Sequence, residues 1–312
     1  MDQLQPTADL LNLVFAYDPP IGIDQLSWYY RDNPEGFASI GRVDKVGLQV
    51  GNYSLVPTRL ESRTQGELRL GLGVDLATHP QYRGAGTFRR TVEDSYRSGS
   101  ANGLQGILGV ANAQSAPRMV EAMGWRMLPH ISARFLVPGV RPPTASSYLV
   151  DQQFLEGPVL ETYLPTPTRP PVTGYGTRWT AELLRWRLSR PGANYVLHVH
   201  EDVVFVSTST RLGPFRVAIL LKVLPRHTDK ERTVRASSRS LATTLARQHR
   251  TPLVLHWGTT PHLRGSGIAL PKRFMPSPLE LVVYAFTNDG LPHFDQDALN
   301  ISAFEFLDFD AY

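Results

Sequence analysis

The sequence HPQYRGAGTFRR (residues 79–90) joins an apolar stretch, LGVDLAT (residues 72–78), to a segment with the spacing of an amphipathic helix. Two glycines, Gly84 and Gly86, stand directly before the start of that helix. A helix N-terminus presents unpaired backbone N–H groups and the positive end of the helix dipole, and glycine lets the backbone approach an anion closely. The stretch therefore predicts either a pyrophosphate-binding loop or an ordinary tight turn.

Two common nucleotide-binding motifs do not fit this stretch. A Walker A loop requires a Gly-Lys-Ser/Thr ending, whereas residues 84–88 read GAGTF. The dinucleotide fingerprint requires a third glycine and an early parallel βαβ unit, and the sequence predicts neither. The choice between an anion site and a plain turn therefore depends on the rest of the chain.

The composition is that of a globular protein. The chain has 312 residues, 42% of them hydrophobic, which allows a large core and about two domains. It has no cysteine, which excludes disulfides, cysteine-ligated metals and a thiol nucleophile, and which fits a reducing cytoplasm. Residues 1–10 lack the pattern of a signal peptide, and no apolar run approaches the roughly 20 residues of a membrane helix. We expect a cytoplasmic protein without a membrane partner.

The charge pattern argues against nucleic acid as a partner. The net charge is +4, and the basic residues are spread along the chain. Nucleic-acid-binding proteins usually carry a dense basic stripe, whereas a modest positive balance suits a small polyphosphorylated ligand. The sequence does not indicate an oligomeric state.

Prolines divide the chain into two halves of similar size. Eight prolines fall between positions 138 and 171, and proline cannot continue a helix or a central strand. We predict an N-terminal domain over residues 1–140, a Pro-rich linker over residues 141–172 and a C-terminal domain over residues 173–312. Strand and helix patterns alternate in both halves, so the predicted class is α/β.

In the first half the predicted order is strands, helix, strand, helix, strand. An amphipathic helix over residues 86–103 follows the glycine loop. An apolar strand over residues 104–112 comes next. The second helix begins near Ser115, which is a good N-cap residue, and ends at Gly124.

These elements carry a resemblance to a known superfamily. Residues 74–90 and 109–125 resemble the GNAT superfamily of acyl-CoA-dependent N-acyltransferases. The motif of that family, (Gln/Arg)-x-x-Gly-x-(Gly/Ala) after a bulged strand, matches residues 81–86. Its asparagine after the next strand matches Asn112, and its helix ending in glycine and an aromatic residue matches residues 124–125.

The resemblance covers residues 20–137 and implies two tandem GNAT-like domains, each a mixed, mainly antiparallel sheet flanked by helices. The second domain is expected to be a degenerate copy. The implied co-substrate is acyl-CoA, either acetyl-CoA or a longer acyl-CoA, bound in the first domain without a metal. The implied binding residues are Leu76, Ala77, Thr78, Arg83, Gly84, Ala85, Gly86, Thr87, Phe88 and Asn112.

Phe88 departs from the family pattern, which usually has a smaller residue at this position. Its side chain either stands beside the phosphate loop or points into the core.

The implied reaction is a direct attack of an amine on the thioester, so no enzyme nucleophile is required. The protein must supply a phosphate cradle, a donor to the developing oxyanion and a base that keeps the amine neutral. The oxyanion donor is expected to be a backbone N–H of the strand before the cradle. Asp75 on that strand is one candidate base, and the alternative is a carboxylate that only satisfies the strand edge.

His198 and His200 are further candidates for the catalytic base. They alternate along LHVHE, which places both on one face of a strand, and imidazole titrates near neutral pH. The alternative is a polar strand face turned to solvent. Metal binding by this pair is not expected, because the sequence shows no third ligand.

The group that protonates the leaving thiolate is unassigned. Many members of the family use a tyrosine in the helix after the asparagine, and here Met119 occupies about that turn and cannot donate a proton. Ser115 or a water molecule would have to take this role.

Two glycines suggest room for an acyl chain longer than acetyl. Gly71 and Gly73 share a strand face with Asp75, and their missing side chains would leave space beside the thioester. The alternative is a bulge that needs only backbone freedom.

The second half offers no second phosphate loop. The predicted strand at residues 217–225 is followed by residues 226–238, which contain no glycine. LRGSG at residues 263–267 imitates the motif but leads to Pro271 rather than into a helix, so we predict a loop. One acyl-CoA site per chain is expected.

The predicted function is transfer of an acyl group from CoA to the amine of an amino sugar or a glycosylated natural product. Medium and long acyl chains are both possible donor groups. The layout resembles N-acyltransferases of teicoplanin-type glycopeptides, which implies antibiotic biosynthesis. Aromatic residues would bind sugar rings or form core: Tyr163, Tyr175, Trp179, Trp186 and Trp257.

Three alternatives stay open. They are a non-catalytic acyl-CoA-binding or regulatory module, an aminoglycoside N-acetyltransferase, and an aminoacyl transferase with a tRNA donor. The last of these predicts a basic groove, which the scattered charges do not favour.

Overall fold

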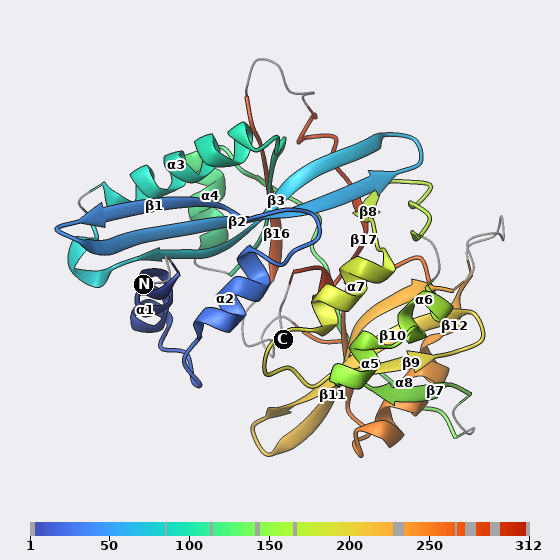
Figure 1. Ribbon diagram of the computed structural model, residues 1–312. Coiled ribbons are helices and arrows are strands. Elements are labelled where there is room, and N and C mark those ends of the chain that lie inside the picture. Colours follow the sequence, from blue (N-terminus) through green and yellow to red (C-terminus); the bar gives the residue numbers. More distant parts are fainter. Residues whose placement is uncertain are drawn as a thin grey trace. The chain divides into compact units, whose positions relative to one another are not determined.

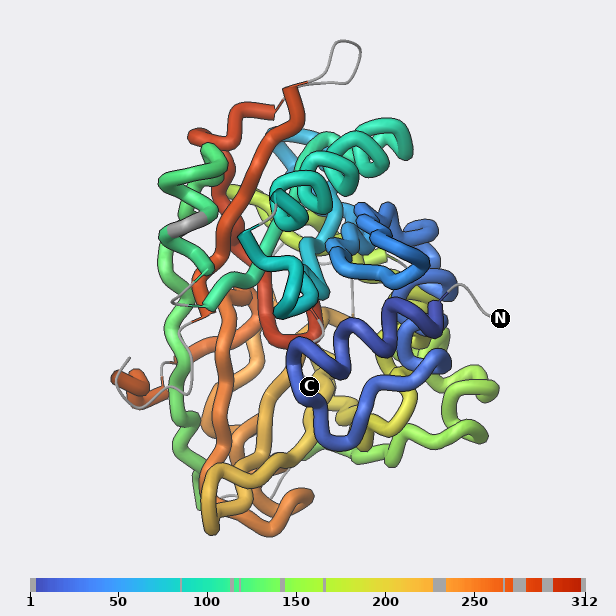
Figure 2. Tube along the Cα trace, turned by 90° about the vertical axis from the view of Figure 1, so that its left-hand side faces the viewer, coloured from blue at the N-terminus to red at the C-terminus, as the bar shows by residue number. Residues whose placement is uncertain are grey.

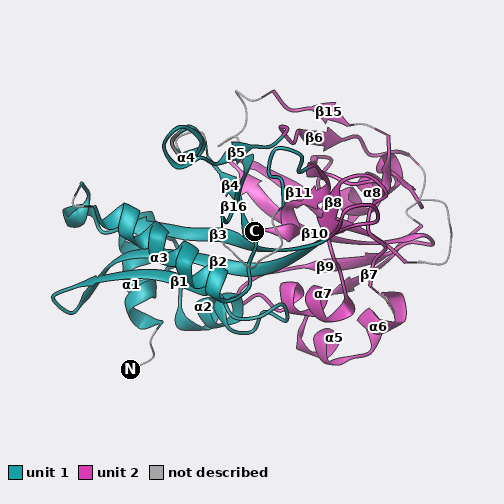
Figure 3. Ribbon diagram, turned by 90° about the horizontal axis from the view of Figure 1, so that it is seen from above, with its two compact units in different colours: residues 1–60, 67–128, 279–299 teal, residues 61–66, 129–278, 300–312 magenta. Residues whose placement is uncertain are grey.

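The chain forms two compact units (Figures 1 and 3). Unit 1 comprises residues 1–60, 67–128 and 279–299, and unit 2 comprises residues 61–66, 129–278 and 300–312. The structure, a computed structural model, describes residues 4–84, 86–112, 115–140, 144–164, 167–226, 234–265, 267–271, 279–287 and 294–309, without the side chain of Arg118.

Unit 1 begins with two helices and continues as alternating strands and helices. Its helices are α1 (Gln5–Phe15), α2 (Ile23–Tyr30), α3 (Thr87–Ala101) and α4 (Ser115–Met123), with a short 3₁₀ helix η1 (Pro80–Tyr82) before α3. Its strands are β1 (Ser39–Lys45), β2 (Leu48–Ser62), β3 (Gly66–Thr78), β4 (Gly106–Ala111), β5 (Arg126–Met127) and β16 (Glu280–Ala285). The turn that joins β2 to β3, residues 61–66, belongs to unit 2.

The sheet of unit 1 is completed by a strand from near the end of the chain. β1 and β2 pair antiparallel, and β3 pairs parallel with β4. β16 pairs antiparallel with β4 on one side and with β5 on the other. Figure 2 shows the red trace of β16 beside the green trace of the segment that contains β5. Because it includes β16, the observed unit differs from the predicted domain over residues 1–140.

The core of unit 1 lies between the sheet and the helices α3 and α4. Its buried side chains are Tyr53, Leu55, Val92, Leu104, Ile107, Ala111, Ala116, Trp125, Val282 and Phe286. The amphipathic pattern predicted over residues 86–103 therefore forms the helix as expected, with Val92 only 2% exposed. The side chains of Val282 and Phe286 show that the segment of residues 279–299 is part of this core.

Unit 2 repeats the order of elements that unit 1 shows around its sheet. Its helices are α5 (Gln152–Glu156), α6 (Val159–Tyr163), α7 (Ala181–Leu188) and α8 (Ser238–Gln248), with a 3₁₀ helix η3 (Phe306–Asp308). Its strands are β6 (Ala133–Leu136), β7 (Ser146–Leu149), β8 (Tyr175–Thr177), β9 (Val196–Val199), β10 (Val203–Leu212), β11 (Phe215–Pro225), β12 (Ala236–Ser237), β13 (Val254–Thr259), β14 (Leu263–Arg264), β15 (Ile268–Ala269) and β17 (Ile301–Glu305).

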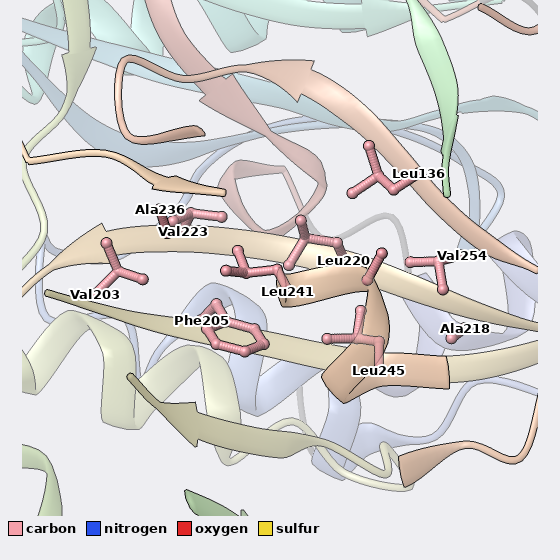
Figure 4. Close-up of a cluster of buried hydrophobic side chains, with 11 residues drawn as sticks. Leu136, Val203, Phe205, Ala218, Leu220, Val223, Ala236, Leu241, Leu245 and Val254 are labelled. Atoms are coloured by element: carbon pink, nitrogen blue, oxygen red, sulfur yellow. The ribbon is translucent and has the colours of Figure 1, made fainter. Parts of the chain in front are cut away.

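The pairing in unit 2 follows the same scheme as in unit 1. β10 and β11 form an antiparallel pair, and β11 runs parallel to β13 after the helix α8, as β3 runs parallel to β4 after α3. β13 then pairs antiparallel with β6, a strand that precedes it by more than a hundred positions. Figure 4 shows the buried cluster between α8 and these strands, which includes Leu220, Leu241 and Val254. The predicted class, a mixed and mainly antiparallel sheet flanked by helices, is confirmed.

The predicted domain boundaries need two corrections. Residues 279–299 belong to unit 1 rather than to the second domain, because β16 fills the place beside β4. The Pro-rich linker over residues 141–172 is not a bare connection, since it contains β7, α5 and α6, and β7 pairs with β9. Pro158 stands at the N-cap of α6, where a missing backbone donor is tolerated.

Unit 2 also buries a cluster of charged residues. Lys222 is 2% exposed, and its Nζ lies 2.6 Å from Asp308 Oδ2 and 3.4 Å from Glu305 Oε2. Glu305 is in turn 3.0 Å from His256 Nε2, and the indole N–H of Trp179 donates to Asp308 Oδ1 at 3.0 Å. The two carboxylates raise the pKa of Lys222 against the opposing effect of burial. The lysine is thus held charged inside the protein.

Candidate functional site

Unit 1 contains a cavity of about 750 Å³. It lies between the C-terminal turn of α1, the end of β3, the start of α3 and one face of α4. Its described lining residues are Val14, Phe15, Leu76, Thr78, Arg83, Gly84, Phe88, Asn112, Ser115, Met119, Ala122 and Met123. Arg83 is the single ionisable side chain among them, so the cavity combines an apolar wall with one positive charge.

The cavity begins where two parallel strands separate. β3 and β4 pair from Leu70 with Gly106 to Gly73 with Gly109. Both strands run on beyond this last pair, β3 as far as Thr78. Leu76 and Thr78 lie on the part of β3 beyond its pairing with β4 and line the cavity. The separation of the strands thus provides one wall of the site.

The glycine loop has a backbone conformation that requires glycine. Gly84 has φ +80° and Gly86 has φ +73°, a region that other L-residues rarely adopt. A Cβ built at either position would meet no atom within 4 Å, so open space lies above both residues. The loop therefore leaves the backbone accessible to a ligand, and does not serve close packing.

The helix start beside the loop is suited to an anion. Gly86 precedes the first residue of α3 and has no side chain to cap the helix, and the first turn contains no acidic residue. The backbone N–H groups of this turn and the helix dipole therefore favour a negative ligand. Arg83 adds a positive charge in the cavity wall. The buried hydroxyl Oγ1 of Thr87 has no hydrogen-bond partner among the described residues, which leaves one further polar group at the helix start.

Asp75 interrupts the extended backbone of β3. Its φ of +56° is left-handed, and its carboxylate accepts a hydrogen bond from the Tyr30 hydroxyl at 2.5 Å. Its carbonyl oxygen accepts from Asn52 Nδ2 at 3.0 Å. Burial, followed by the negative charge of Asp75, raises the pKa of Tyr30 well above its ordinary value. Tyr30 therefore keeps its proton and acts as a donor to Asp75.

Asn112 and Ser115 bind each other at the start of α4. The backbone N–H of Ser115 donates to Asn112 Oδ1 at 2.9 Å, and Ser115 Oγ accepts from the Asn112 backbone N–H at 3.1 Å. Ser115 Oγ also lies 3.1 Å from Asn112 Oδ1 as a donor. The hydroxyl thus faces the cavity while it caps the turn. Its assignment as the proton donor to a leaving thiolate stays a prediction.

The structure brings most of the predicted binding residues to one place. Six of the ten line the cavity: Leu76, Thr78, Arg83, Gly84, Phe88 and Asn112. Gly86 and Thr87 form the helix start beside it. Ala77 is 1% exposed and is not among the lining residues, and Ala85 lies outside the described residues. Phe88 is 44% exposed, so it stands beside the loop rather than in the core.

The two histidines that were candidates for the catalytic base have different surroundings in unit 2. His198 is fully buried in unit 2, where its ring nitrogens lie 2.8 Å from Ser147 Oγ and 2.7 Å from Ser207 Oγ. Burial, and then the charge of His249, lowers the pKa of His198 to about 3. His200 is half-buried beyond the end of β9, and its Nδ1 accepts from the Asp202 backbone N–H at 3.4 Å. Neither lines the cavity of unit 1.

The space predicted beside Gly71 and Gly73 is filled. A Cβ at Gly71 would lie 2.7 Å from the Cβ of Leu55, and one at Gly73 would lie 2.2 Å from the Tyr53 hydroxyl. These glycines therefore allow the side chains of β2 to pack against β3. They leave no room for an acyl chain.

Four of the five aromatic residues named for the second half form core. Tyr175, Trp179, Trp186 and Trp257 are each less than 9% exposed. Tyr163 is half-buried; its hydroxyl lies 3.2 Å from the Tyr148 hydroxyl, and the Arg226 guanidinium lies over its ring. For the four buried rings the core alternative is the one the structure shows, so they do not indicate a sugar site.

Some lining residues were not predicted from the sequence. Val14 and Phe15 come from α1, and Ala122 and Met123 come from the last turn of α4. The signal in α4 is the spacing of residues 115, 119, 122 and 123, which places them on one helical face. The contribution of α1 depends on tertiary packing and has no local sequence signal.

Comparison with known proteins shows similarity in structure only. No family model matches the chain, and no curated protein matches its sequence. A conserved protein of unknown function from Enterococcus faecalis, described as a probable N-acyltransferase, matches with a TM-score of 0.58 at 10% identity, over 91% of this chain and 69% of the other. A GCN5-related N-acetyltransferase from Anabaena variabilis matches with a TM-score of 0.57 at 10% identity, over 90% and 70%.

A third neighbour was solved with its ligand. The N-myristoyltransferase of Saccharomyces cerevisiae, with bound myristoyl-CoA, matches with a TM-score of 0.52 at 13% identity, over 93% of this chain and 77% of the other. The chain has a GNAT-like fold. Within that fold the separated strands, the glycine loop and the start of α3 occupy consecutive positions in unit 1. At these identities the GNAT-like fold is what the comparisons establish.

No group of three or more His, Cys, Asp or Glu side chains within the described residues is arranged to hold a metal ion. Among the described helices none is both long and apolar enough to cross a membrane.

Proposed function

We propose that this protein is an acyl-CoA-dependent N-acyltransferase whose co-substrate binds in the cavity of unit 1. The observation that carries the proposal is the open glycine loop at residues 84–86, which leads from the separated strand β3 into the uncapped start of α3. Both glycines are left-handed, and open space lies above them. The GNAT-like fold of the chain supports the same reaction class.

Each part of the cavity has a distinct role in this proposal. The backbone N–H groups at the start of α3 and the Arg83 guanidinium hold the pyrophosphate of CoA. The part of β3 beyond its pairing with β4, with Leu76 and Thr78, faces the pantetheine arm. A backbone N–H of this strand donates to the oxygen that becomes negative when the amine attacks the thioester carbon. A carbon–nitrogen bond forms, the carbon–sulfur bond breaks, and CoA leaves as the thiolate. The proton that the amine loses passes through water to the thiolate or to solvent.

A binding experiment with charge-reversed glycine variants tests the site. Gly86→Glu should abolish binding of CoA, because the new carboxylate occupies the phosphate position and repels it. Isothermal titration with CoA and acetyl-CoA gives the dissociation constants directly. CoA at about a hundred times its dissociation constant should also stabilise the parent protein by roughly 2.7 kcal/mol.

Gly47→Glu is the matched control. Gly47 lies between β1 and β2, has φ +76° and has open space around its Cβ position, as Gly86 does. Both variants therefore strain a left-handed residue equally, and only one adds charge to the cavity. Unchanged CoA affinity in Gly86→Glu, or an equal loss in Gly47→Glu, would contradict the proposed site.

The acceptor is proposed to be a primary amine, and an amino sugar or a glycosylated natural product is the class implied by the sequence resemblance. A panel of amino sugars, aminoglycosides, peptides with free N-termini and arylamines, assayed by release of free thiol, separates these classes. A graded series of acyl-CoAs in the same assay gives the preferred chain length. The apolar lining from Val14, Phe15, Met119 and Met123 favours donors longer than acetyl.

A second candidate is a non-catalytic acyl-CoA-binding module. The observation in its favour is that Arg83 is the single ionisable group among the described lining residues, with Met119 rather than a proton donor on α4. This candidate predicts tight acyl-CoA binding without thiol release in the presence of any amine of the panel. The N-acyltransferase predicts release that depends on the amine.

A further inference from the structure

Asp75 is unusual among the residues of this chain. Four described residues other than glycine have positive φ, namely Ala16, Val46, Asp75 and Arg250. Ala16 ends α1, Val46 lies in the turn between β1 and β2, and Arg250 follows α8. Asp75 alone of these four lies inside a strand. A left-handed residue in a strand persists where its surroundings fix it, and such positions cluster at functional sites.

Two buried side chains fix Asp75 from opposite ends of the residue. The Tyr30 hydroxyl donates to the carboxylate, and the Asn52 amide donates to the main-chain carbonyl. Tyr30 is 2% exposed and Asn52 is 0% exposed. Because neither donor can turn to water, the loss of its acceptor would leave a buried polar group unpaired. The side chain and the backbone of Asp75 are therefore held at the same time.

The donors are themselves held by a buried polar chain. Asn52 Nδ2 also donates to Ser54 Oγ at 3.2 Å, and Asn52 Oδ1 accepts from Gln49 Nε2 at 3.3 Å. Gln49 Oε1 accepts from the Thr7 hydroxyl of α1 at 3.1 Å. Thr7, Gln49 and Ser54 are all buried. A connected and satisfied network of this kind specifies one arrangement of its members.

The residue that follows the clamp lines the cavity. Leu76 follows Asp75 directly in the chain. Leu76 and Thr78 both belong to the cavity wall, whereas Asp75 does not. A left-handed residue inside a strand turns the adjoining peptide away from the direction of an extended backbone. The orientation of the peptide between Asp75 and Leu76 therefore depends on the backbone angle that Tyr30 and Asn52 enforce.

We propose that Tyr30 and Asn52 are positioning residues that lock Asp75 in the left-handed conformation and thereby orient the Asp75–Leu76 peptide toward the thioester oxygen. This inference rests on the proposed N-acyltransferase function. It gives Asp75 a conformational role, in which its carboxylate is the acceptor that closes the clamp and is not the base for the amine.

Variants at Asp75 separate the two roles. Asp75→Asn keeps an oxygen acceptor for Tyr30 and a side chain that tolerates the left-handed region, so its kcat should stay within about three-fold of the parent. Asp75→Ala removes the acceptor and disfavours the backbone angle, and Tyr30→Phe removes the donor. Both should lower kcat by about ten-fold or more, because the reacting groups lose their alignment. The dissociation constant for CoA should not change.

Tyr53→Phe is the matched control. Tyr53 is a buried tyrosine on β2 beside β3, and its hydroxyl has no hydrogen-bond partner among the described residues. Its variant should match the parent in kcat and in CoA affinity. If Asp75→Asn loses as much activity as Asp75→Ala, the carboxylate acts as a base and the positioning role is overturned.

Hydrogen exchange of residues 72–78 gives a readout that does not need turnover. Exchange there should be faster in Tyr30→Phe and Asp75→Ala than in the parent and Tyr53→Phe, with residues 106–111 of β4 as the internal reference. Parent-like exchange in both variants would overturn the clamp. If the parent releases no thiol with any amine, the proposed function fails, and the exchange rates alone decide whether the clamp exists.

Discussion

At the scale of single residues, two buried tyrosines of unit 1 have opposite hydrogen-bond states. The Tyr30 hydroxyl donates to Asp75. The Tyr53 hydroxyl is buried against Gly73 without a hydrogen-bond partner among the described residues. An unpaired buried hydroxyl costs free energy, whereas a paired one recovers it.

The same substitution should therefore have opposite effects at these two positions. Tyr53→Phe should raise the free energy of unfolding by about 1 kcal/mol, and Tyr30→Phe should lower it by about 1 to 3 kcal/mol because the Asp75 carboxylate loses a donor. Urea denaturation of both variants and the parent measures the difference. Equal changes in the two variants would show that their hydroxyls have equivalent surroundings.

Lys222 is the residue whose loss should damage unit 2 most. Lys222→Met should lower the free energy of unfolding by about 3 to 5 kcal/mol, because Asp308 and Glu305 would be left as buried charges without a partner. The control is Arg97→Met, since the Arg97–Asp94 pair is exposed at 76% and 41% and an exposed pair contributes at most about 1 kcal/mol. Thermal or urea unfolding gives both values. A small effect at Lys222 would mean that the carboxylates are neutral in the folded protein.

At the scale of elements, a chain of hydrogen bonds links β7, β9, β10 and the end of α8. Ser147 contacts His198, His198 contacts Ser207, and Ser207 Oγ lies 2.8 Å from His249 Nε2. Burial lowers the pKa of His198 to about 3 and that of His249 to about 4, from an ordinary 6.5, with Arg216 as a second cause at His249. Both imidazoles are therefore neutral in the folded protein near pH 7.

This chain of hydrogen bonds predicts that the folded protein loses stability in acid. Below about pH 6.5 the unfolded chain takes up protons at these two histidines and the folded protein does not, so the free energy of unfolding falls as the pH falls. The slope should reach about 1.4 kcal/mol per pH unit for each histidine until the pH approaches the folded pKa values. Urea denaturation between pH 7 and pH 4 measures it. His198→Gln should lower the slope by about 1.4 kcal/mol per pH unit, the contribution of one proton.

The elements with local signals were the ones that could be predicted from sequence. The glycine loop, the helix after it, the helix that ends at Gly124 and the hairpin of β9 and β10 all follow from periodicity and turn residues. β16 could not be placed, because its partner β4 is far away in the chain and an apolar strand does not specify its neighbour. The burial of His198 was missed for a related reason, since period-two alternation does not show which face of a strand is covered.

The site was predictable to a similar extent. Gly84 and Gly86 mark a backbone conformation that few other residues adopt, so the loop is visible in the sequence. The clamp on Asp75 joins α2, β2 and β3, and its residues have no fixed spacing. The part of the cavity wall formed by α1 also depends on tertiary packing and has no local sequence signal.

At the scale of the whole molecule, the sheets of the two units both contain a pair of strands that lie far apart in the chain, and in unit 1 one of them comes from near its end. β6 follows the elements of unit 1 and pairs with β13 in unit 2, and β16 follows the elements of unit 2 and pairs with β4 in unit 1. Val282 of β16 is 0% exposed and belongs to the core of unit 1. Cutting the chain at its Pro-rich region would therefore remove a core strand from unit 1.

A fragment of residues 1–140 should fail to give a soluble CoA-binding protein, because β4 would have an open apolar edge. β5 and β16 are antiparallel neighbours, with Met127 opposite Val282. Residues 1–128 joined to residues 279–299 by a loop of about four residues should therefore restore the sheet. Size-exclusion chromatography and CoA titration compare the two proteins, and Val282→Asp in the joined chain is the negative control. A soluble, CoA-binding 1–140 fragment would contradict this prediction.

The pairing of β4 with the late strand β16 also sets an order for folding during synthesis on the ribosome. The cavity-bearing unit is translated first, yet its sheet cannot close until β16 has left the exit tunnel, about 150 residues after β5. At typical elongation rates of about 5 to 20 residues per second, this interval is about 8 to 30 s. During that time the nascent chain carries an unpaired strand edge at β4, which attracts other strands. The N-terminal part of this protein is thus made first but cannot complete its sheet until most of unit 2 has been synthesised, and holdase chaperones have their opportunity to act in that interval.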